Sequence, residues 1–233
     1  MRWFDFSKKV PLAPLFEDFT DWHCHILPGV DDGFRTMEES LDILSGYEQA
    51  GVLRVHFTPH IMEDVPNTPD ELRARFAELK AAYTGSIDLS LASENMLDSL
   101  FAARLEAGDL LPLDENGRLL VETSYYNPPL GFREMLRKIR QAGWEPVLAH
   151  PERYRYMKEE DYRSLNREGI LFQLNLPSMV GLYGQTAQKK AEWLLENAMY
   201  SYSATDLHQK AIFEKMGQAR VPAKFFERLR LLL

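Results

Sequence analysis

The sequence has a single cysteine, Cys24, so no disulfide can form within the chain. A chain without disulfides suits a reducing compartment. The sequence also lacks any apolar run of the roughly 20 residues that a membrane-spanning helix needs, and its first residues lack the apolar segment and small-residue cleavage site of a signal peptide. These absences predict a cytoplasmic protein that does not insert into a membrane.

An excess of positive charge is missing as well. The chain carries 27 Lys and Arg against 35 Asp and Glu, which gives a net charge of −8. Proteins that bind nucleic acid through its phosphate backbone usually carry a positive excess, so nucleic acid is not the expected partner. Bound metal ions can still create a positive site in an acidic protein. A hydrophobic fraction of 45% is ordinary for a globular protein and supplies a sizeable core.

The motifs of several common catalytic sites are absent, namely G-x-x-x-x-G-K-[ST], G-x-S-x-G, H-E-x-x-H and C-x-x-C. Cys24 does not fit the cysteine-based phosphatases either. These enzymes need Cys-x5-Arg, and the sixth residue after Cys24 is Val30. We therefore expect Cys24 to be a small apolar residue of a strand.

Short β-rich runs alternate with amphipathic helical segments along most of the chain. The runs cover residues 19–25, 53–60, 87–94, 118–124, 145–150, 170–175 and 199–206. The segments between them repeat apolar residues at i, i+3, i+4 and i+7, as amphipathic helices do. Repeated βα units of this kind predict a parallel sheet. No linker rich in Gly, Ser or Pro divides the chain, so we expect one domain over residues 19–233, preceded by an extended N-terminal arm over residues 1–18.

Two of the helical segments begin with recognisable capping signals. Thr36 is followed three residues later by Glu39, and Thr68 is followed by Glu71. In this arrangement the threonine side chain and the glutamate side chain each bind a free backbone N–H of the first turn. The sequence therefore predicts that helices begin just after Thr36 and Thr68.

Residues that can bind metal ions lie at or just beyond the ends of the β-rich runs. Parallel α/β folds collect their chemistry at the C-terminal ends of strands, so these residues are expected on one rim. They are His23, His25, His60, Glu94, Glu122, His150, Asp206 and His208. Residues i and i+2 of a strand point to the same face, so His23 and His25 can reach one ion while Cys24 points away.

A single histidine at a strand end is more often a hydrogen-bonded structural residue than a metal ligand. Here five of the six histidines lie at such ends, which favours a metal site, because imidazole and carboxylate are the ligands that zinc, manganese and iron sites use. His56, inside the second run, is expected to face helices or solvent. In the turn after His25, either Asp31 or Asp32 can complete the metal shell, with ordinary turn chemistry as the alternative. We favour Asp32.

Arg153 lies three residues beyond His150, in the segment H-P-E-R-Y. A guanidinium at this position can bind phosphate oxygens with two parallel hydrogen bonds. The alternative is a salt bridge at the surface. We favour the phosphate role.

Four segments together, D-W-H-C-H-I-L-P-G-V-D-D-G, T-P-H, H-P-E-R-Y and T-D-L-H, resemble the PHP superfamily, named for polymerase and histidinol phosphatase. More narrowly, they resemble the bacterial PHP-type protein-tyrosine phosphatases of capsule and exopolysaccharide operons. The similarity extends from about Asp21 to about His208. It implies an α/β fold of the distorted (β/α)7 barrel type. It also implies up to three divalent metal ions, with manganese preferred and iron, cobalt or zinc as alternatives.

The resemblance implies a role for each candidate ligand. The three implied ligand sets are His23, His25, Glu94 and Asp206; then Glu94, Glu122 and His150; and finally Asp32, His60 and His208. Arg153 matches the phosphate-binding arginine of the family. Some members carry a second arginine shortly after the D-x-H motif, whereas this chain has Lys210 in that stretch and no arginine.

The activity implied by the resemblance is metal-dependent hydrolysis of phosphotyrosine on a protein such as a bacterial tyrosine autokinase of capsular or exopolysaccharide synthesis. Arg153 and His208 are the expected catalytic side chains, with a metal-bound water as the alternative proton donor to His208. The aromatic residues expected in the rim loops can sandwich a phosphotyrosine ring or simply pack at the mouth of the fold; they are Phe34, Tyr125, Tyr126, Tyr154 and Tyr183. The oligomeric state is left open.

Three other functions are compatible with a scaffold of this type. The first is a phosphoesterase for a small molecule such as histidinol phosphate or a nucleotide. The second is a regulatory module without catalytic activity, against which the complete ligand set argues. The third is an amidohydrolase, which often uses a carboxylated lysine, and no lysine ends any of the predicted strands.

Overall fold

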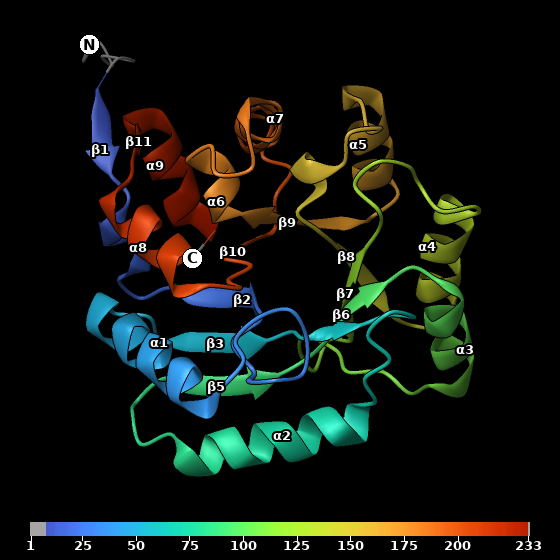
Figure 1. Cartoon of the computed structure of the whole chain (residues 1–233). Helices are drawn as coiled ribbons and strands as arrows, with labels where there is room; N and C mark the ends of the chain where they lie inside the picture. The colour runs from blue at the N-terminus through green and yellow to red at the C-terminus, as the bar shows by residue number, and fades with distance from the viewer. Residues whose placement is uncertain (1–7, 233) are drawn as a thin grey trace.

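A computed structural model describes residues 8–232 as a mixed α/β structure (Figure 1). Its parallel strands form two sheets. The larger sheet has the order β10-β9-β8-β7-β6-β4, formed by Tyr202–Ala204, Leu171–Asn175, Glu145–Ala149, Arg118–Glu122, Glu94–Met96 and His60–Ile61. The smaller sheet has the order β2-β3-β5, formed by Thr20–Cys24, Arg54–Phe57 and Asp88–Leu91. All pairs within these two sheets are parallel, as predicted.

The division into two sheets arises where two of the predicted runs are interrupted. The run 53–60 is interrupted at Thr58 and Pro59 and forms β3 and β4, while the run 87–94 forms β5 and β6. β3 pairs with β5 in the smaller sheet, whereas β4 pairs with β6 in the larger one. Each run therefore contributes to both sheets. The predicted parallel α/β arrangement is confirmed, while the described strands are assigned to two sheets rather than one.

The first and last strands of the parallel set lie next to each other. The His25 N–H donates to the Leu207 carbonyl at 3.0 Å, and the Asp206 N–H donates to the His23 carbonyl at 2.8 Å. Cys24 and Leu207 also form a parallel bridge. The segment after β2 is thereby joined to the segment after β10, and both carry candidate ligands.

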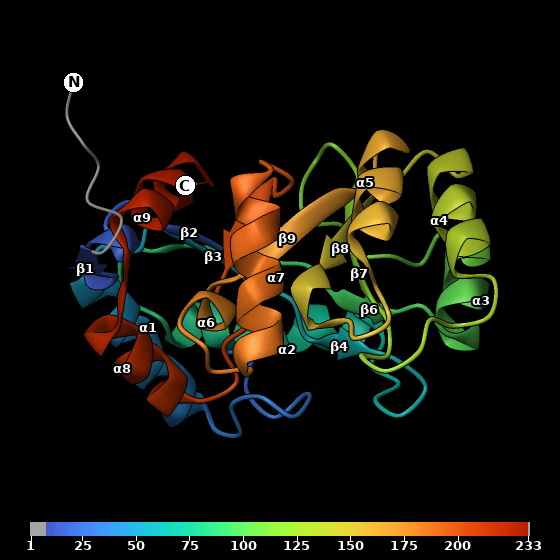
Figure 2. The ribbon, with the colours of Figure 1, turned by 90° about the horizontal axis from the view of Figure 1, so that it is seen from above.

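Helices lie around the outside of the strands (Figures 1 and 2). They are α1 Met37–Ala50, α2 Pro69–Ala82, α3 Ser99–Ala107, α4 Phe132–Gln141, α5 Glu159–Arg167, α6 Leu176–Met179, α7 Gln185–Glu196, α8 Lys210–Gln218 and α9 Ala223–Leu229. Both predicted capping boxes are confirmed at the starts of α1 and α2. Within residues 8–232, no helix is long and apolar enough to cross a membrane.

Alternation along the central strands separates two apolar clusters. In β7, Leu119 and Val121 belong to the main core, while Leu120 belongs to a smaller cluster. In β8, Leu148 belongs to the main core and Val147 to the smaller cluster. Successive residues of a strand point to opposite faces, so the sheet is buried on both sides. This explains why β7 and β8 carry consecutive apolar residues, over 119–121 and 147–149.

Residues 1–7 of the predicted N-terminal arm lie outside the described residues. The rest of the arm is packed against the C-terminal part of the chain. β1, Lys9–Pro11, pairs antiparallel with β11, Arg220–Pro222. The 3-10 helix Ala13–Phe16 follows, and the Phe16 ring meets the ring of Phe213 edge-on with 5.1 Å between centroids.

We predict that Phe16→Ala lowers the free energy of unfolding by about 3–5 kcal/mol, because it removes a large side chain that is 1% exposed. Chemical denaturation measures this change. Leu53→Ala is the matched control, since Leu53 is 56% exposed and its truncation should cost less than about 0.5 kcal/mol. Equal, small effects of the two substitutions would show that residues 8–18 are not an integral part of the fold.

Candidate metal centre

All nine predicted ligands lie together at the C-terminal ends of the parallel strands. They form three overlapping groups in which the nitrogen and oxygen atoms lie within 4.8 Å of one another. The groups are His25, Asp32, His60 and His208; His23, Glu94, His150 and Asp206; and His60, Glu94 and Glu122. The resemblance implies that His25 shares an ion with His23, whereas His25 lies here with Asp32, His60 and His208. The resemblance implies that His150 belongs with Glu122, whereas His150 lies here with His23 and Asp206. The membership of the cluster is as predicted, and the division into groups differs.

The two histidines that follow β2 converge on one point. The Nε2 atoms of His23 and His25 are 3.0 Å apart. Between them, Cys24 points the other way and is completely buried, with its Sγ donating to the His56 carbonyl at 3.5 Å. This is the side-chain arrangement that the i, i+2 spacing predicts.

Glu94 is at the centre of the cluster and is almost completely buried. Its Oε2 lies 3.1 Å from His60 Nδ1, 3.2 Å from His23 Nε2 and 3.3 Å from His25 Nε2. Its other oxygen, Oε1, is 3.0 Å from His150 Nε2. One carboxylate thus contacts four imidazoles, which is the position expected of a bridging ligand.

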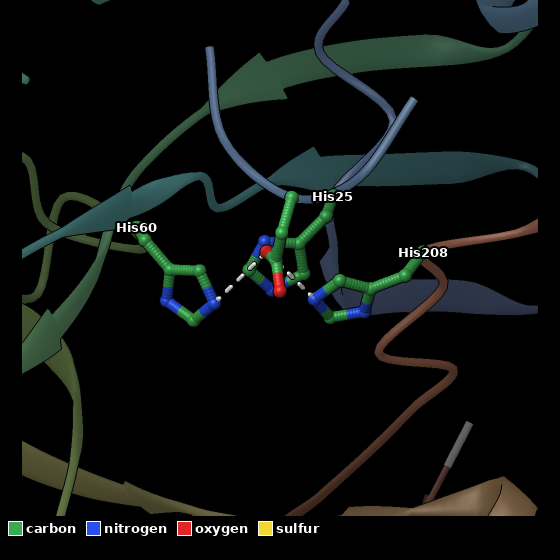
Figure 3. Close-up of side chains that lie close together, drawn as sticks. His25, His60 and His208 are labelled. Atoms are coloured by element: carbon green, nitrogen blue, oxygen red, sulfur yellow. Dashed lines mark ion pairs between the residues drawn. The ribbon is translucent and has the colours of Figure 1, made fainter. Parts of the chain in front are cut away.

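The two aspartates after His25 have different positions. Asp32 is exposed, and its Oδ1 lies 3.3 Å from His208 Nε2 and 3.5 Å from His60 Nε2. Figure 3 shows these imidazoles and that of His25 directed toward one another. Asp31 has a buried carboxylate, which lies 2.7 Å from His25 Nδ1 and accepts the His60 N–H at 3.1 Å. Asp32 therefore lies among the groups that can hold an ion, while Asp31 orients His25.

Two of the candidate ligands have backbone conformations that are rare for residues with a side chain. His150 has φ of 33° and Asp206 has φ of 49°. Non-glycine residues in this region carry a local conformational cost and are concentrated at functional sites. The surrounding hydrogen bonds maintain these conformations, since the His150 N–H donates to Gln173 at 3.3 Å and the Asp206 N–H donates to the strand β2 backbone.

The chemistry of the cluster fits divalent metal ions. Imidazole and carboxylate are the ligands of zinc, manganese and iron sites. Within residues 8–232, several buried atoms of the cluster have no hydrogen-bond partner of acceptable geometry, among them His60 Nδ1, Glu94 Oε2 and His150 Nδ1. Unpaired polar atoms are costly when buried, and His60 Nδ1 and Glu94 Oε2 lie 3.1 Å apart, so an ion is favoured as their missing partner.

The charges of the protein alone also favour cations. Burial lowers the pKa of His23, but the carboxylates of Glu94 and Asp206 outweigh burial and raise it to about 9. Conversely, burial raises the pKa of Glu94, but the neighbouring His23 and His60 outweigh it and hold the pKa well below its usual range. The imidazoles therefore keep protons to neutralise the carboxylates. Divalent ions would displace these protons, so metal binding is coupled to proton release.

Three supporting residues were not found from the sequence. The Gln173 Oε1 lies 3.0 Å from His23 Nδ1, and the Asn175 amide donates to Asp206 Oδ2 at 2.8 Å. Both residues belong to β9, the only predicted strand without an assigned ligand, and their i, i+2 spacing in an otherwise apolar run was an available signal. The third residue, Asp21, joins β2 to the β10 end of the sheet.

The Asp21 carboxylate accepts hydrogen bonds from the Thr205 N–H at 2.8 Å, the Thr205 hydroxyl at 2.6 Å and the Tyr47 hydroxyl at 2.9 Å. Burial raises the pKa of Asp21 to about 6, although these hydrogen bonds partly oppose the shift. Asp21 and Thr205 each lie close in sequence to candidate ligands, namely His23 and Asp206. This contact therefore fixes the two ligand-bearing segments relative to each other.

Arg153 lies beside the cluster and contacts Asp206 and two tyrosine rings. Its Nη1 donates to Asp206 Oδ2 at 2.7 Å, and its guanidinium lies 4.3 Å from the Tyr125 ring centre and 4.1 Å from the Tyr183 ring centre. Of the other predicted rim aromatics, Tyr154 is completely buried. Lys210 lies in the stretch where some family members carry a second arginine. Its Nζ is 2.5 Å from Asp42 Oδ2.

Phe34 and Tyr126 complete the set of rim aromatics, and they differ in exposure. Phe34 is buried in the main core, while Tyr126 is 59% exposed. Tyr125, Tyr126 and Tyr183 line one pocket next to the cluster, whereas Phe34 contributes to a second pocket with the candidate ligands Asp32 and His208. Tyr154 serves packing.

His56 lies outside the metal-binding groups, in agreement with the sequence-based interpretation. Its surroundings differ from those expected. The ring is 4% exposed and stacks on Trp22 with 4.3 Å between ring centres, and its Nδ1 is 2.9 Å from Ser90 Oγ. His56 therefore packs beside the smaller apolar cluster instead of facing helices or solvent.

These features define an α/β protein with a cluster of candidate metal ligands at the C-terminal ends of its parallel strands. Residues 19–220 match the family model described as capsular polysaccharide synthesis, CpsB/CapC. Because this match covers most of the chain, the protein belongs to the CpsB/CapC family.

Named relatives are similar over most of their length. The chain is 26% identical to tyrosine-protein phosphatase YwqE of Bacillus subtilis over 230 residues, covering 91% of each protein. It is 28% identical to tyrosine-protein phosphatase CpsB of Streptococcus pneumoniae over 201 residues, covering 81% of this chain and 82% of that protein. A putative tyrosine-protein phosphatase CapC of Staphylococcus aureus is 23% identical over 194 residues, covering 81% of this chain and 76% of that protein.

Solved structures resemble the fold. A structure from a study of YwqE from Bacillus subtilis and CpsB from Streptococcus pneumoniae, described as unique metal-dependent tyrosine phosphatases, matches with a TM-score of 0.70 and 24% identity, covering 92% of this chain and 94% of that chain. A zinc-bound amidohydrolase from Burkhoderia ambifaria matches with a TM-score of 0.54 and 13% identity, covering 97% of this chain and 88% of that chain. At these identities the two structures support the fold alone.

We predict that His56→Gln makes stability less dependent on pH. Burial lowers the pKa of His56 from 6.5 to about 4. Between these values the unfolded chain binds a proton that the folded protein excludes, so this histidine reduces stability as the pH falls from 6.5 toward 4. At pH 5 the loss amounts to about 2 kcal/mol, at 1.36 kcal/mol for each pH unit below 6.5. Urea denaturation at pH 7.5, 6 and 5 measures it. Parallel curves for parent and variant would contradict the prediction.

Proposed function

We propose that the protein is a metal-dependent protein-tyrosine phosphatase. The observation that carries the proposal is the cluster of nine imidazole and carboxylate groups with the Arg153 guanidinium beside it. Membership of the CpsB/CapC family and the names of the relatives, which are tyrosine-protein phosphatases, support the same conclusion. Binding anionic phosphate requires positive charge, which an acidic chain can provide through bound cations and a positioned arginine.

We propose that up to three divalent ions are bound, manganese in the first place and iron, cobalt or zinc as alternatives. The proposed ligands are His23, His25, Asp32, His60, Glu94, Glu122, His150, Asp206 and His208. Bound there, such ions supply positive charge to the phosphoryl oxygens and lower the pKa of water, which makes it a nucleophile near neutral pH. Glu94 suits a shared ligand because both of its oxygens face imidazoles.

Arg153 is proposed to bind and orient the phosphate. Its Nη1 is engaged by Asp206, and the rings of Tyr125 and Tyr183 lie close to the guanidinium. These contacts restrain the guanidinium, while its remaining N–H groups can donate to phosphoryl oxygens as negative charge redistributes. A preoriented donor of this kind loses little conformational entropy when substrate binds.

His208 is proposed as a ligand through Nε2 or, in the alternative in which Nε2 carries a proton instead of an ion, as the proton donor. Its Nδ1 lies 2.9 Å from the Asp206 carbonyl oxygen, which accepts the Nδ1 hydrogen and leaves Nε2 on the side of Asp32. The side chain is 21% exposed, the most accessible histidine of the cluster. Phenolate is a good leaving group, so the reaction needs only modest acid assistance.

We also propose that the two sheets together form a distorted seven-stranded barrel within a single domain over residues 19–233. Backbone hydrogen bonds continue the pairing through the interrupted runs, from Ala92 to the Phe57 carbonyl at 2.8 Å and from Glu94 to the Thr58 carbonyl at 3.2 Å. The contacts between the segments after β2 and β10 support closure of the ring.

The proposed substrate is a phosphotyrosine protein, such as a bacterial tyrosine kinase of capsule or exopolysaccharide synthesis. A cytoplasmic location is proposed with it, since the single thiol, Cys24, is buried and suits a reducing compartment. Turnover of phosphotyrosine peptide, histidinol phosphate and single-stranded DNA by the manganese-loaded protein tests the substrate class. Turnover confined to histidinol phosphate or DNA, or none of any aryl phosphate with any of the four metals, would refute the proposal.

We predict that His150→Ala reduces both bound metal and phosphatase activity. The substitution removes an imidazole that contacts Glu94 at 3.0 Å within the cluster. Loss of one ligand should lower activity by at least about 100-fold. Metal content by mass spectrometry and hydrolysis of phosphotyrosine peptide are the measurements. His56→Ala is the matched control and should retain the metal content of the parent. Parent activity in His150→Ala would contradict its assignment as a ligand.

We predict that Arg153→Ala lowers kcat/KM for phosphotyrosine by about 10- to 100-fold, the range expected for a charged hydrogen bond to phosphate, while bound metal is retained. Steady-state kinetics and metal analysis on the same preparation separate the two effects. The matched control is Arg163→Ala, another arginine that covers an aromatic ring, Trp193, but outside this site. Unchanged kinetics in Arg153→Ala would leave the arginine with a structural role only.

A further inference from the structure

A pocket of about 550 Å³ lies next to the metal centre and shares Arg153 with it. One wall comes from the segment after β7, with Tyr125 and Tyr126, and another from the segment after β8, with Arg153 and Arg155. Tyr183 and the start of α7 close the third side. A substrate bound to Arg153 through its phosphate would therefore have this pocket beside it.

The charged groups that line the pocket are Glu152, Arg153, Arg155 and Lys190. Glu152 is 1% exposed, and its carboxylate accepts hydrogen bonds from the Asn175 N–H at 3.0 Å and the Tyr200 hydroxyl at 2.9 Å. Its negative charge is therefore directed into the protein. The remaining three groups are cationic, which makes this a basic pocket on a chain with a net charge of −8.

Two of the three cations already have partners. Arg153 pairs with Asp206 at 2.7 Å, and the Lys190 ammonium donates to the backbone carbonyls of Met157, at 2.8 Å, and Tyr154. Arg155 is different. Its guanidinium lies over the exposed Tyr126 ring at 4.7 Å, and no carboxylate of residues 8–232 lies within 4.0 Å of it. Its N–H groups are available to an anion from outside.

The distance between Arg153 and Arg155 matches the distance between nearby residues of one extended peptide. Arg153 and Arg155 are two residues apart, so their α-carbons are separated by no more than about 7 Å. The backbone N–H of Arg155 donates to the Tyr125 carbonyl at 2.8 Å, which joins the segment of Arg155 to the loop that carries Tyr125 and Tyr126. A residue two positions from a phosphotyrosine on an extended peptide lies at similar spacing. Arg155 can thus meet a side chain close to the phosphorylated one.

We infer that this pocket binds an acidic side chain of the substrate peptide close to the phosphotyrosine, with Arg155 as a residue that determines specificity. The inference rests on the proposed function, since it assumes a phosphotyrosine peptide at the metal centre. Arg155 holds the acid by a charge-assisted hydrogen bond, and Tyr126 supports its guanidinium. Binding of the second anion improves recognition of the peptide without contributing to the chemical step.

The test compares kcat/KM for phosphotyrosine peptides flanked by two Glu, two Gln or two Lys residues on each side, using the manganese-loaded full chain. The parent protein should prefer the Glu peptide to the Gln peptide by about fivefold at low salt, which is the scale of a partly exposed ion pair. In Arg155→Gln this ratio should fall to about one. In Arg155→Glu the Lys peptide should become the preferred substrate. Arg163→Gln is the matched control and should keep the ratio of the parent.

A peptide with a second phosphotyrosine distinguishes the source of the anion. If kcat/KM for this peptide exceeds that for the Glu peptide in the parent but not in Arg155→Gln, the pocket selects phosphate rather than carboxylate. The inference of an acidic side chain is then overturned. The inference is also overturned if the ratio of kcat/KM for the Glu peptide to that for the Gln peptide is the same in the parent and in Arg155→Gln. Because each ratio is measured within one variant, a change in folding or metal content does not produce these outcomes. If the parent hydrolyses none of the peptides, the proposed function itself fails.

Discussion

The site depends on the neutralisation of carboxylates that the fold buries. Glu94 and Asp206 are almost completely buried, where an unpaired carboxylate would carry a large desolvation cost. Imidazoles from the ends of four strands, β2, β4, β8 and β10, and the guanidinium of Arg153 surround them. The supporting contacts of Asp31, Gln173 and Asn175 orient these groups in turn. Positive charge, whether carried as protons on imidazole or as metal ions, is therefore part of what holds the strand ends together.

Much of the site could be predicted from the sequence, because the relevant rules depend only on the order of elements and on local periodicity. Strand-end histidines fall on one rim in any parallel α/β fold, and the i, i+2 spacing brings His23 and His25 together. The division of the strands between two sheets could not be predicted, since it depends on pairing between distant segments. The i, i+2 spacing of Gln173 and Asn175 could have indicated that both side chains lie on one face of β9, but not that this face is the one that carries the ligands.

Shared ligands make the three groups parts of one cluster. Glu94 and His60 each belong to two groups, so a change at either alters two candidate ion positions at once. Effects of substitutions within such a network are not additive, and the protonation of one imidazole depends on that of its neighbours. The difference between the implied ligand sets and the observed groups is understandable in these terms, because a shared ligand can be counted with either neighbour.

The contact between Asp21 and Thr205 has a consequence for the order of folding. The two residues are 184 positions apart in the sequence, yet they join the segments that carry His23 and Asp206. Closing so long a loop costs entropy that only the completed strands between them can repay. The cluster is therefore complete only when the two ends of the parallel set have been brought together, because His23 and His25 lie at one end and Asp206 and His208 at the other.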